Sequence, residues 1–136
     1  MNPTASGKPS WATRILLGLL CLTTLPYGLQ CLADPKAVAD MAGVLAGGAN
    51  AATELRAAYG GFQIAAAVLC GVAVFRPVLQ SGALLFTVIW LGGSAVGRAY
   101  GVAVAGEANG YIQFALAYET VGTAWAAWLL LRRPAA

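Results

Sequence analysis

The charged side chains leave long uncharged stretches, and this spacing constrains the fold more than any other feature of the chain. Residues 15–33, 57–75 and 77–97 contain no Asp, Glu, Lys or Arg, and residues 111–131 contain only Glu119. Each stretch has about the 20 residues that a helix needs to cross a hydrocarbon core. Inside lipid every backbone polar group must be paired within its own segment, so helices are predicted. The expected spans are residues 13–33, 54–75, 77–104 and 111–131.

The composition supports a membrane protein and excludes several other classes. Only 10% of the 136 residues are charged, whereas soluble globular proteins have about 25%. Hydrophobic residues make up 60%, and there is no histidine. These values exclude a disordered chain, a nucleic-acid-binding domain and an ordinary soluble enzyme. We therefore predict an all-α fold, in which residues 1–136 form a single membrane domain, a four-transmembrane-helix bundle.

Two of the three connections between spans are predicted to be tight hairpins. Arg76 is followed by Pro77, and proline cannot continue the preceding helix. Residues 107–110 have the sequence Glu-Ala-Asn-Gly, which is typical of a turn. The third and fourth spans are therefore expected to be antiparallel neighbours.

The first connection, residues 34–53, is long enough to contain a helix of its own. Asp34-Pro35 is a helix-start signal, and apolar residues then recur at helical spacing. We predict a short interfacial helix that ends near Gly47-Gly48. Thr53 is a candidate cap for the second span.

The distribution of cations predicts the orientation of the chain. Five cations are expected at one end of the bundle and one at the other. The five are Lys8, Arg14, Arg76, Arg132 and Arg133, and the one is Lys36. Because cytoplasmic loops carry the excess of Lys and Arg, both termini of this multi-pass protein are predicted to be cytoplasmic.

A competing interpretation treats residues 1–33 as a cleaved signal peptide. Lys8 and Arg14 would form its basic region, and Cys31-Leu32-Ala33 resembles a cleavage site. The apolar run 15–33 is longer than the usual run of about 7–15 residues, which favours a retained span.

Ionisable groups within the spans are the candidates for function, because placing a charge in lipid is costly. Arg98 and Glu119 are both expected in the half of the bundle away from the termini, close enough for contact. Arg56, Tyr59 and Gln63 have the spacing of one α-helical face, which places Arg56 near that pair. These five residues are predicted to line a polar pocket for the anionic or carbonyl head of an amphiphile.

Several neighbouring residues are assigned other roles. Tyr118 and Gln113 fall on other faces of the fourth span and are left out of the pocket. The aromatic residues Phe62, Phe86, Trp90 and Phe114 are assigned to packing or to contact with lipid.

Small residues predict where helices approach each other. Gly93, Gly97 and Gly101 form two consecutive G-x-x-x-G steps, and Glu119 lies on a stripe with Gly122. Both patterns predict close packing of the third and fourth spans. The same observation supports an alternative, in which Arg98 and Glu119 only hold the bundle together.

No residue pattern indicates catalysis or a bound metal. There is no histidine, no Asp within a span and no Ser or Cys beside a base. The three cysteines form no Cys-x-x-Cys pair and are interpreted as small buried hydrophobes. We expect no enzymatic activity, no metal and no cofactor.

Some of these residues also resemble a known group of proteins. The segment from Glu54 to Gly61 reads E-L-R-A-A-Y-G-G, and Gly97-Arg98 and Glu119 follow. This pattern, over residues 54–133, resembles an uncharacterised family of small four-helix bacterial membrane proteins. The resemblance implies a four-span inner-membrane protein and no known activity. The family positions that it marks are Glu54, Arg56, Tyr59, Gly60, Gly61, Arg98 and Glu119.

Three hypotheses for function follow from the sequence. The first is a non-enzymatic protein, embedded in the lipid bilayer, that binds a lipid or other amphiphile in the polar pocket. The second is a structural or accessory subunit that docks on a membrane partner or on another copy of itself. A proton-coupled transporter with Glu119 as the proton carrier comes last. None of the three involves nucleic acid.

Overall fold

The computed structural model describes residues 10–45 and 47–132, so that Lys8 and Arg133 lie outside the described residues. Within that part of the chain nearly every residue is helical and none is in a strand. In chain order the elements are α1 (Trp11–Ala33), α2 (Pro35–Ala42), α3 (Gly48–Leu55), the π-helix η1 (Arg56–Gly61), α4 (Phe62–Phe75), the 3-10 helix η2 (Pro77–Leu79), α5 (Gln80–Ala105) and α6 (Gly110–Leu131).

Four of the helices are long and apolar enough to cross a membrane. They are Trp11–Ala33, Gly48–Phe75, Pro77–Ala105 and Gly110–Leu131. The second of them is made of α3, η1 and α4, which continue one another without a break. This confirms the predicted all-α fold with four membrane-spanning helices.

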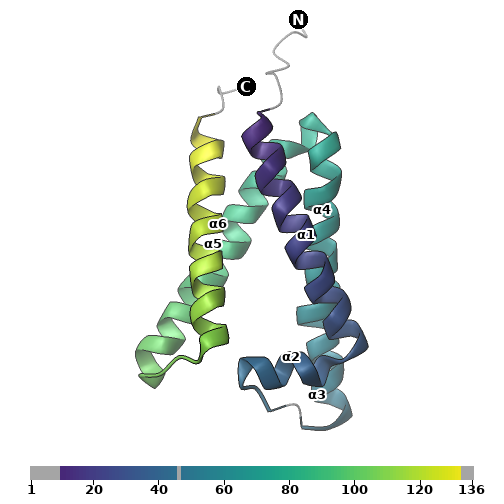
Figure 1. The fold of residues 1–136 in the computed structure, drawn as a ribbon, viewed down its shortest axis with the longest axis vertical. Coiled ribbons are helices and arrows are strands. Elements are labelled where there is room, and N and C mark those ends of the chain that lie inside the picture. Colours follow the sequence, from purple (N-terminus) through teal and green to yellow (C-terminus); the bar gives the residue numbers. More distant parts are fainter. Residues whose placement is uncertain (1–9, 46, 133–136) are drawn as a thin grey trace, which may run out of the picture.

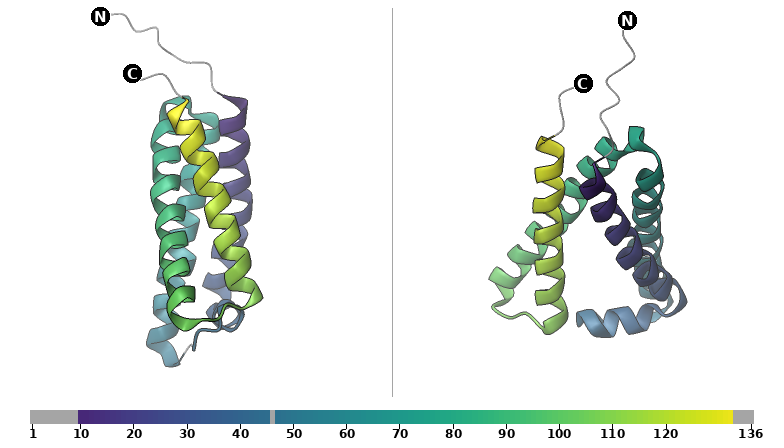
Figure 2. Two further views of the ribbon diagram at one scale, coloured as in Figure 1. Left: turned by 90° about the vertical axis from the view of Figure 1, so that its left-hand side faces the viewer. Right: turned by 45° about the horizontal axis from the view of Figure 1, so that its top comes forward.

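The spanning helices form two pairs that diverge. The most extensive contacts are between α1 and α4 and between α5 and α6, and few contacts join one pair to the other. The pairs meet where α1 begins and α6 ends, which we call the core end, and separate towards α2 (Figure 1). The right-hand view of Figure 2 shows the same inverted V with α2 lying across its wide end. We call this wide end the α2 end.

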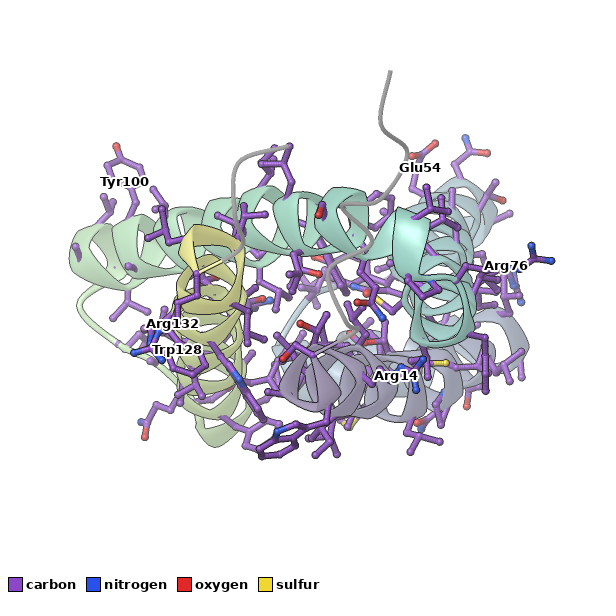
Figure 3. All side chains as sticks on the ribbon, turned by 90° about the horizontal axis from the view of Figure 1, so that it is seen from above. Arg14, Glu54, Arg76, Tyr100, Trp128 and Arg132 are labelled. Carbon is purple, nitrogen blue, oxygen red and sulfur yellow. The ribbon has the colours of Figure 1, made fainter. Side chains whose placement is uncertain are left out.

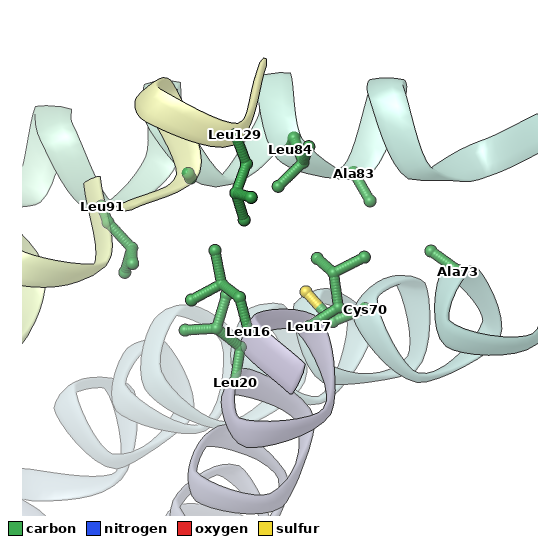
Figure 4. Close-up of a cluster of buried hydrophobic side chains, with 10 residues drawn as sticks. Leu16, Leu17, Leu20, Cys70, Ala73, Ala83, Leu84, Leu91 and Leu129 are labelled. Atoms are coloured by element: carbon green, nitrogen blue, oxygen red, sulfur yellow. The ribbon is translucent and has the colours of Figure 1, made fainter. Parts of the chain in front are cut away.

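A buried apolar cluster joins the two pairs at the core end (Figure 4). Leu17 of α1 and Leu84 of α5 are fully buried, and Leu129 of α6 lies against the same cluster. Cys70 and Ala73 fill the α4 side. Because lipid tails are as apolar as leucine, this cluster stabilises the bundle through close packing, with little contribution from the removal of apolar surface from water.

A second cluster fixes α2 beneath α1. Val38 and Ala39 of α2 are buried against Cys31 of α1 and Leu55 of α3. The Asp34 side chain accepts hydrogen bonds from the backbone N–H groups of Lys36 and Ala37, which confirms the predicted helix start. The first loop therefore contains a short helix, as predicted, and its place at the membrane interface stays a prediction.

Three predicted boundaries in this loop were wrong. α2 ends at Ala42, where Gly43 has a φ of 73°, and not near Gly47-Gly48. Gly48, with a φ of 88°, instead starts the second span, six residues earlier than expected. Thr53 caps nothing, because it lies inside α3 and its hydroxyl donates to the Ala49 carbonyl. Gly43 and Gly48 mark the helix boundaries in this loop because both have a positive φ, a backbone conformation that is strained for other residues.

The described arginines of the basic set are gathered at the core end. Seen from above that end, Arg14, Arg76 and Arg132 project from the ends of three different helices (Figure 3). The Arg132 guanidinium lies over the Trp128 ring, 4.2 Å from its centroid. Lys36 lies on α2 and pairs with Asp40 at 2.6 Å. The asymmetry on which the orientation was predicted is thus present in three dimensions, and the side of the membrane stays a prediction.

Candidate functional site

A cavity of about 790 Å³ lies between the two helix pairs, in the half of the bundle towards the α2 end. It is bounded by α1, by η1 and α4, by α5 and by α6. The two helix pairs diverge towards the α2 end, and the buried side chains of the core end do not fill the space between them there. Four of the five residues predicted for the pocket line it: Tyr59, Gln63, Arg98 and Glu119.

The predicted pair of Arg98 and Glu119 is confirmed. The Arg98 Nε donates to Glu119 Oε2 at 3.0 Å, and its Nη2 donates to Oε1 at 2.9 Å. The Glu119 side chain is 9% exposed and that of Arg98 is 23% exposed. Two parallel charge-assisted hydrogen bonds at low exposure make this a strong and geometrically specific contact.

Small residues on α5 and α6 bring this pair together, and one of them, Gly122, is among the glycines predicted to do so. A methyl group added to Gly122 would lie 2.6 Å from Leu91 Cδ1, and one added to Gly92 would lie 3.3 Å from Thr123 Cγ2. Close approach of α5 and α6 therefore depends on Gly92 and Gly122. The stripe around Glu119 had indicated Gly122 correctly.

The G-x-x-x-G steps do not form the contact predicted for them. Apart from the adjacent residues and the backbone of α5 itself, no heavy atom of the described residues lies within 4 Å of a methyl group built on Gly93, Gly97 or Gly101. Gly97 lines the cavity, and Gly93 and Gly101 are exposed. Glycine spacing cannot say which of two faces of a helix meets its neighbour, and the wrong face was chosen.

Arg56 does not line the cavity, which corrects the prediction that it joins Arg98 and Glu119. Its Nε donates to the Leu32 carbonyl at 3.0 Å, one of the carbonyls left without an intrahelical partner at the end of α1. Arg56 thus fixes the end of the first span to the second. Glu54 is exposed on α3 and also lies outside the cavity (Figure 3).

The π-helix explains why the spacing misplaced Arg56. Residues 56–61 form η1, and the Phe62 N–H bonds to the Ala57 carbonyl, five residues back. A turn of π-helix contains more than the 3.6 residues of an α-helix, so positions i, i+3 and i+7 no longer share a face. Tyr59 and Gln63 face the cavity together, and Arg56 is rotated away. Short π-helices are frequent at functional sites.

The two glycines of the E-L-R-x-x-Y-G-G motif differ in their roles. Gly60 is buried against α1, where an added methyl group would lie 2.8 Å from Leu32 Cδ2. On α1 itself, a methyl group on Gly28 would lie 3.0 Å from the Gly60 carbonyl oxygen. Gly61 is exposed and has only one such neighbour, the Arg56 carbonyl oxygen at 3.8 Å. Gly60 therefore allows the π-helix to lie against α1.

Hydroxyl groups that were not predicted for the site bridge the two pairs. The hydroxyls of Thr23 and Tyr118 lie 2.7 Å apart, and those of Tyr27 and Tyr111 are also 2.7 Å apart. All four residues line the cavity. The Arg98 guanidinium lies 5.9 Å from the centroid of the Tyr111 ring. Tyr118 had been excluded because the angular spacing of residues along α6 cannot show that Thr23 of α1 reaches it.

Three of the aromatic residues assigned to packing or lipid also line the cavity. They are Phe62, Trp90 and Phe114. Phe62 and Trp90 are 6.0 Å apart between ring centroids and connect α4 with α5, and Phe86 stacks on Trp90 at 5.6 Å. Phe114 lies near Tyr118 at 6.4 Å. The walls are therefore rich in aromatic rings.

Gln113 is outside the cavity, and its amide donates to the Ala108 carbonyl.

The cysteines and acidic residues offer no metal site in residues 10–45 and 47–132, where no three potential ligands gather. Cys31 and Cys70 are buried, Cys21 is partly buried, and all three are free. The Cys31 thiol donates to the Leu55 carbonyl at 3.3 Å. These contacts fit cysteines that act as small core residues.

Four membrane-length helices around a cavity with a buried arginine–glutamate pair define a small multi-span membrane protein with an internal polar site. A family model described as a domain of unknown function, DUF4345, matches residues 12–130. The chain belongs to this family. The match includes α1, which the resemblance in the second half of the chain did not cover. No curated protein and no solved structure matches the chain.

Proposed function

We propose that this protein is non-enzymatic and binds a lipid or another amphiphilic small molecule in the cavity between its helix pairs. The observation that carries the proposal is that Arg98 and Glu119 face a cavity of about 790 Å³. A pair that served only to hold two helices together would require no such space. Ligand pockets have volumes of about 300–1,000 Å³, with apolar walls and a few convergent polar groups.

The position of the cavity favours a ligand that reaches it from the bilayer. Phe62 and Phe114 line the cavity and are nevertheless 45% and 71% exposed on the surface of the bundle. Their helices are membrane spans, so this exposed surface would face lipid. An apolar tail would leave the cavity past these rings, while the head remained beside the ion pair.

We further propose that the protein resides in the bacterial inner membrane with both termini in the cytoplasm. The arginines at the core end support this orientation through the excess of positive charge in cytoplasmic loops. The cavity would then occupy the outer half of the membrane.

A structural or accessory subunit is the second candidate. The exposed face of α5, with Gly93 and Gly101, supports it, because a helix of a partner or of a second copy would pack closely there. A proton-coupled transporter is disfavoured by the geometry of Glu119. Both of its oxygens accept hydrogen bonds from Arg98, so the arginine, and not a proton, balances its charge.

Native mass spectrometry of the purified full-length chain tests the proposal. Ala115→Phe should fill part of the cavity, and Ala124→Phe adds the same ring at an exposed position of α6. The wild type and Ala124→Phe should retain a co-purifying lipid or small molecule, and Ala115→Phe should lose it. A wild-type protein that carries no molecule would refute binding, and a retained partner subunit would favour the second candidate.

A further inference from the structure

The charges of the cavity limit the kind of head group that it can take. Of the described residues that line it, only Arg98 and Glu119 are ionised, and they neutralise each other through two hydrogen bonds. Arg56, which would have provided an unbalanced positive charge, is bound to the Leu32 carbonyl outside the cavity. An anionic head would therefore bring one uncompensated negative charge into a weakly hydrated space, at high cost. A neutral head carries no such cost.

The polar groups that remain in the cavity can each donate a hydrogen bond. Binding of Glu119 uses Nε and Nη2 of Arg98, which leaves Nη1 for a ligand. The Tyr59 hydroxyl and the Gln63 amide line the same cavity and make no hydrogen bond to any other described residue. An arginine N–H, a phenol O–H and an amide N–H₂ are together suited to carbonyl oxygens, which only accept.

The walls favour a flat ring. Seven aromatic residues from all four spans line the cavity: Tyr27, Tyr59, Phe62, Trp90, Tyr111, Phe114 and Tyr118. Aromatic rings prefer offset-stacked or edge-to-face contacts with another ring, and such contacts add to the gain from burial alone. An acyl chain would gain nothing from the ring geometry and would leave the donors without acceptors.

We infer that the cavity takes a neutral amphiphile whose head is a flat ring with carbonyl oxygens, such as a quinone ring with an apolar tail. The inference rests on the proposed function and specifies its ligand class. In this arrangement the ring lies among the aromatic residues, its carbonyl oxygens accept from Arg98 Nη1, Tyr59 and Gln63, and the tail leaves towards lipid. The Arg98–Glu119 pair orients the guanidinium and keeps the cavity neutral.

Trp90 provides a reporter inside the cavity. In a variant that keeps Trp90 and carries Trp11→Phe, Trp125→Phe and Trp128→Phe, a decyl-tailed benzoquinone should quench the fluorescence saturably, because quinone rings quench indoles on contact. A second variant keeps Trp128 alone, which is outside the cavity, and should show only non-saturable quenching by quinone dissolved in the detergent micelle.

Matched substitutions locate the binding groups. Tyr59→Phe and Gln63→Leu each remove one hydrogen bond to the ring and should weaken binding by about three- to tenfold. Tyr100→Phe, which alters a 72% exposed tyrosine of α5, and Gln113→Leu should leave the affinity unchanged. Decyl phosphate and decanol, which have the same tail and lack the ring, should not displace the quinone.

Other outcomes would overturn the inference, and they separate it from the proposed function. If decyl phosphate or decanol displaces the quinone and restores the Trp90 fluorescence, the cavity binds amphiphiles in general and the ring-carbonyl class is wrong. If no saturable quenching occurs although the wild-type protein retains another molecule in native mass spectrometry, the class is again wrong and the binding role stands. If neither binding nor retention occurs, both are wrong.

Discussion

Removing one partner of the Arg98–Glu119 pair should destabilise the fold more than any other single change of charge in the described chain. Glu119→Gln keeps the size of the side chain and leaves the Arg98 guanidinium with an uncompensated charge. Breaking a buried pair in this way costs about 3–5 kcal/mol. The Arg98 side chain is 23% exposed and can keep some contact with water, which places the expected loss near the lower limit, at about 3 kcal/mol.

The double variant Arg98→Gln/Glu119→Gln measures the interaction energy between the two residues separately from the effect of losing each one. It contains no unpaired charge, so it should be more stable than either single variant, with a coupling energy of about 2 kcal/mol. The assay is reversible unfolding of the protein in mixed micelles by sodium dodecyl sulfate, followed by far-ultraviolet circular dichroism. The control is Asp40→Asn, which breaks the exposed Lys36–Asp40 pair on α2 and should not change stability measurably.

The result that would refute this reasoning is equally specific. If Glu119→Gln changes the free energy of unfolding no more than Asp40→Asn does, the two charges are hydrated and the cavity is not the low-dielectric site described above. The same conclusion would follow from a coupling energy close to zero. The charge reversal Arg98→Glu/Glu119→Arg adds a functional readout, because it should restore stability while the loss of ligand binding persists.

Three further predictions test the orientation of the chain, a helix cap and a close contact between helices. In a background without native cysteines, single cysteines at Ser10 and Glu107 should be labelled from opposite sides of the membrane, and labelling of both from outside would contradict the orientation. Asn109→Ala should lower the free energy of unfolding by about 1 kcal/mol, because the Asn109 side chain accepts from the Ile112 N–H, and Asn109→Asp should retain that cap. Gly28→Ala should cost about 1–3 kcal/mol because its methyl group would lie 2.8 Å from Ile64 Cγ1, while Gly18→Ala, with no described neighbour within 4 Å, should be tolerated.

The spans and the central ion pair could be predicted from the sequence because both depend on the depth of residues along a helix. A charge inside an apolar stretch must find a partner at its own depth, and the short hairpin at 107–110 limited the partners of Arg98 to Glu119. Depth is fixed by counting residues at 1.5 Å each, and this count is little affected by a small change in helix type.

What could not be predicted depends on rotation about the helix axis and on which spans pair. The face of Arg56 was computed with α-helical periodicity, and the single π-turn at 56–61 changed it. The pairing of α1 with α4 makes Thr23 and Tyr27 neighbours of α6 across the cavity, and no local pattern in either segment indicates that contact. The helix contact predicted for Gly93 and Gly101 was wrong because it too depended on which face of α5 meets α6.

The π-helix also has a genetic consequence. Its characteristic hydrogen bond encloses one residue more than an α-helical bond, so η1 is equivalent to one codon inserted into an otherwise regular span. Loss of one codon between Arg56 and Gly61 would shorten the gene by three bases and keep the hydropathy of the span. It would also turn η1 into ordinary α-helix and leave α3 and α4 at nearly the same rotation, so that the change of face would be confined to residues 56–61, Tyr59 among them. A comparison of related genes should therefore treat a one-residue gap at this position as a change of site, even where every other marked residue is the same.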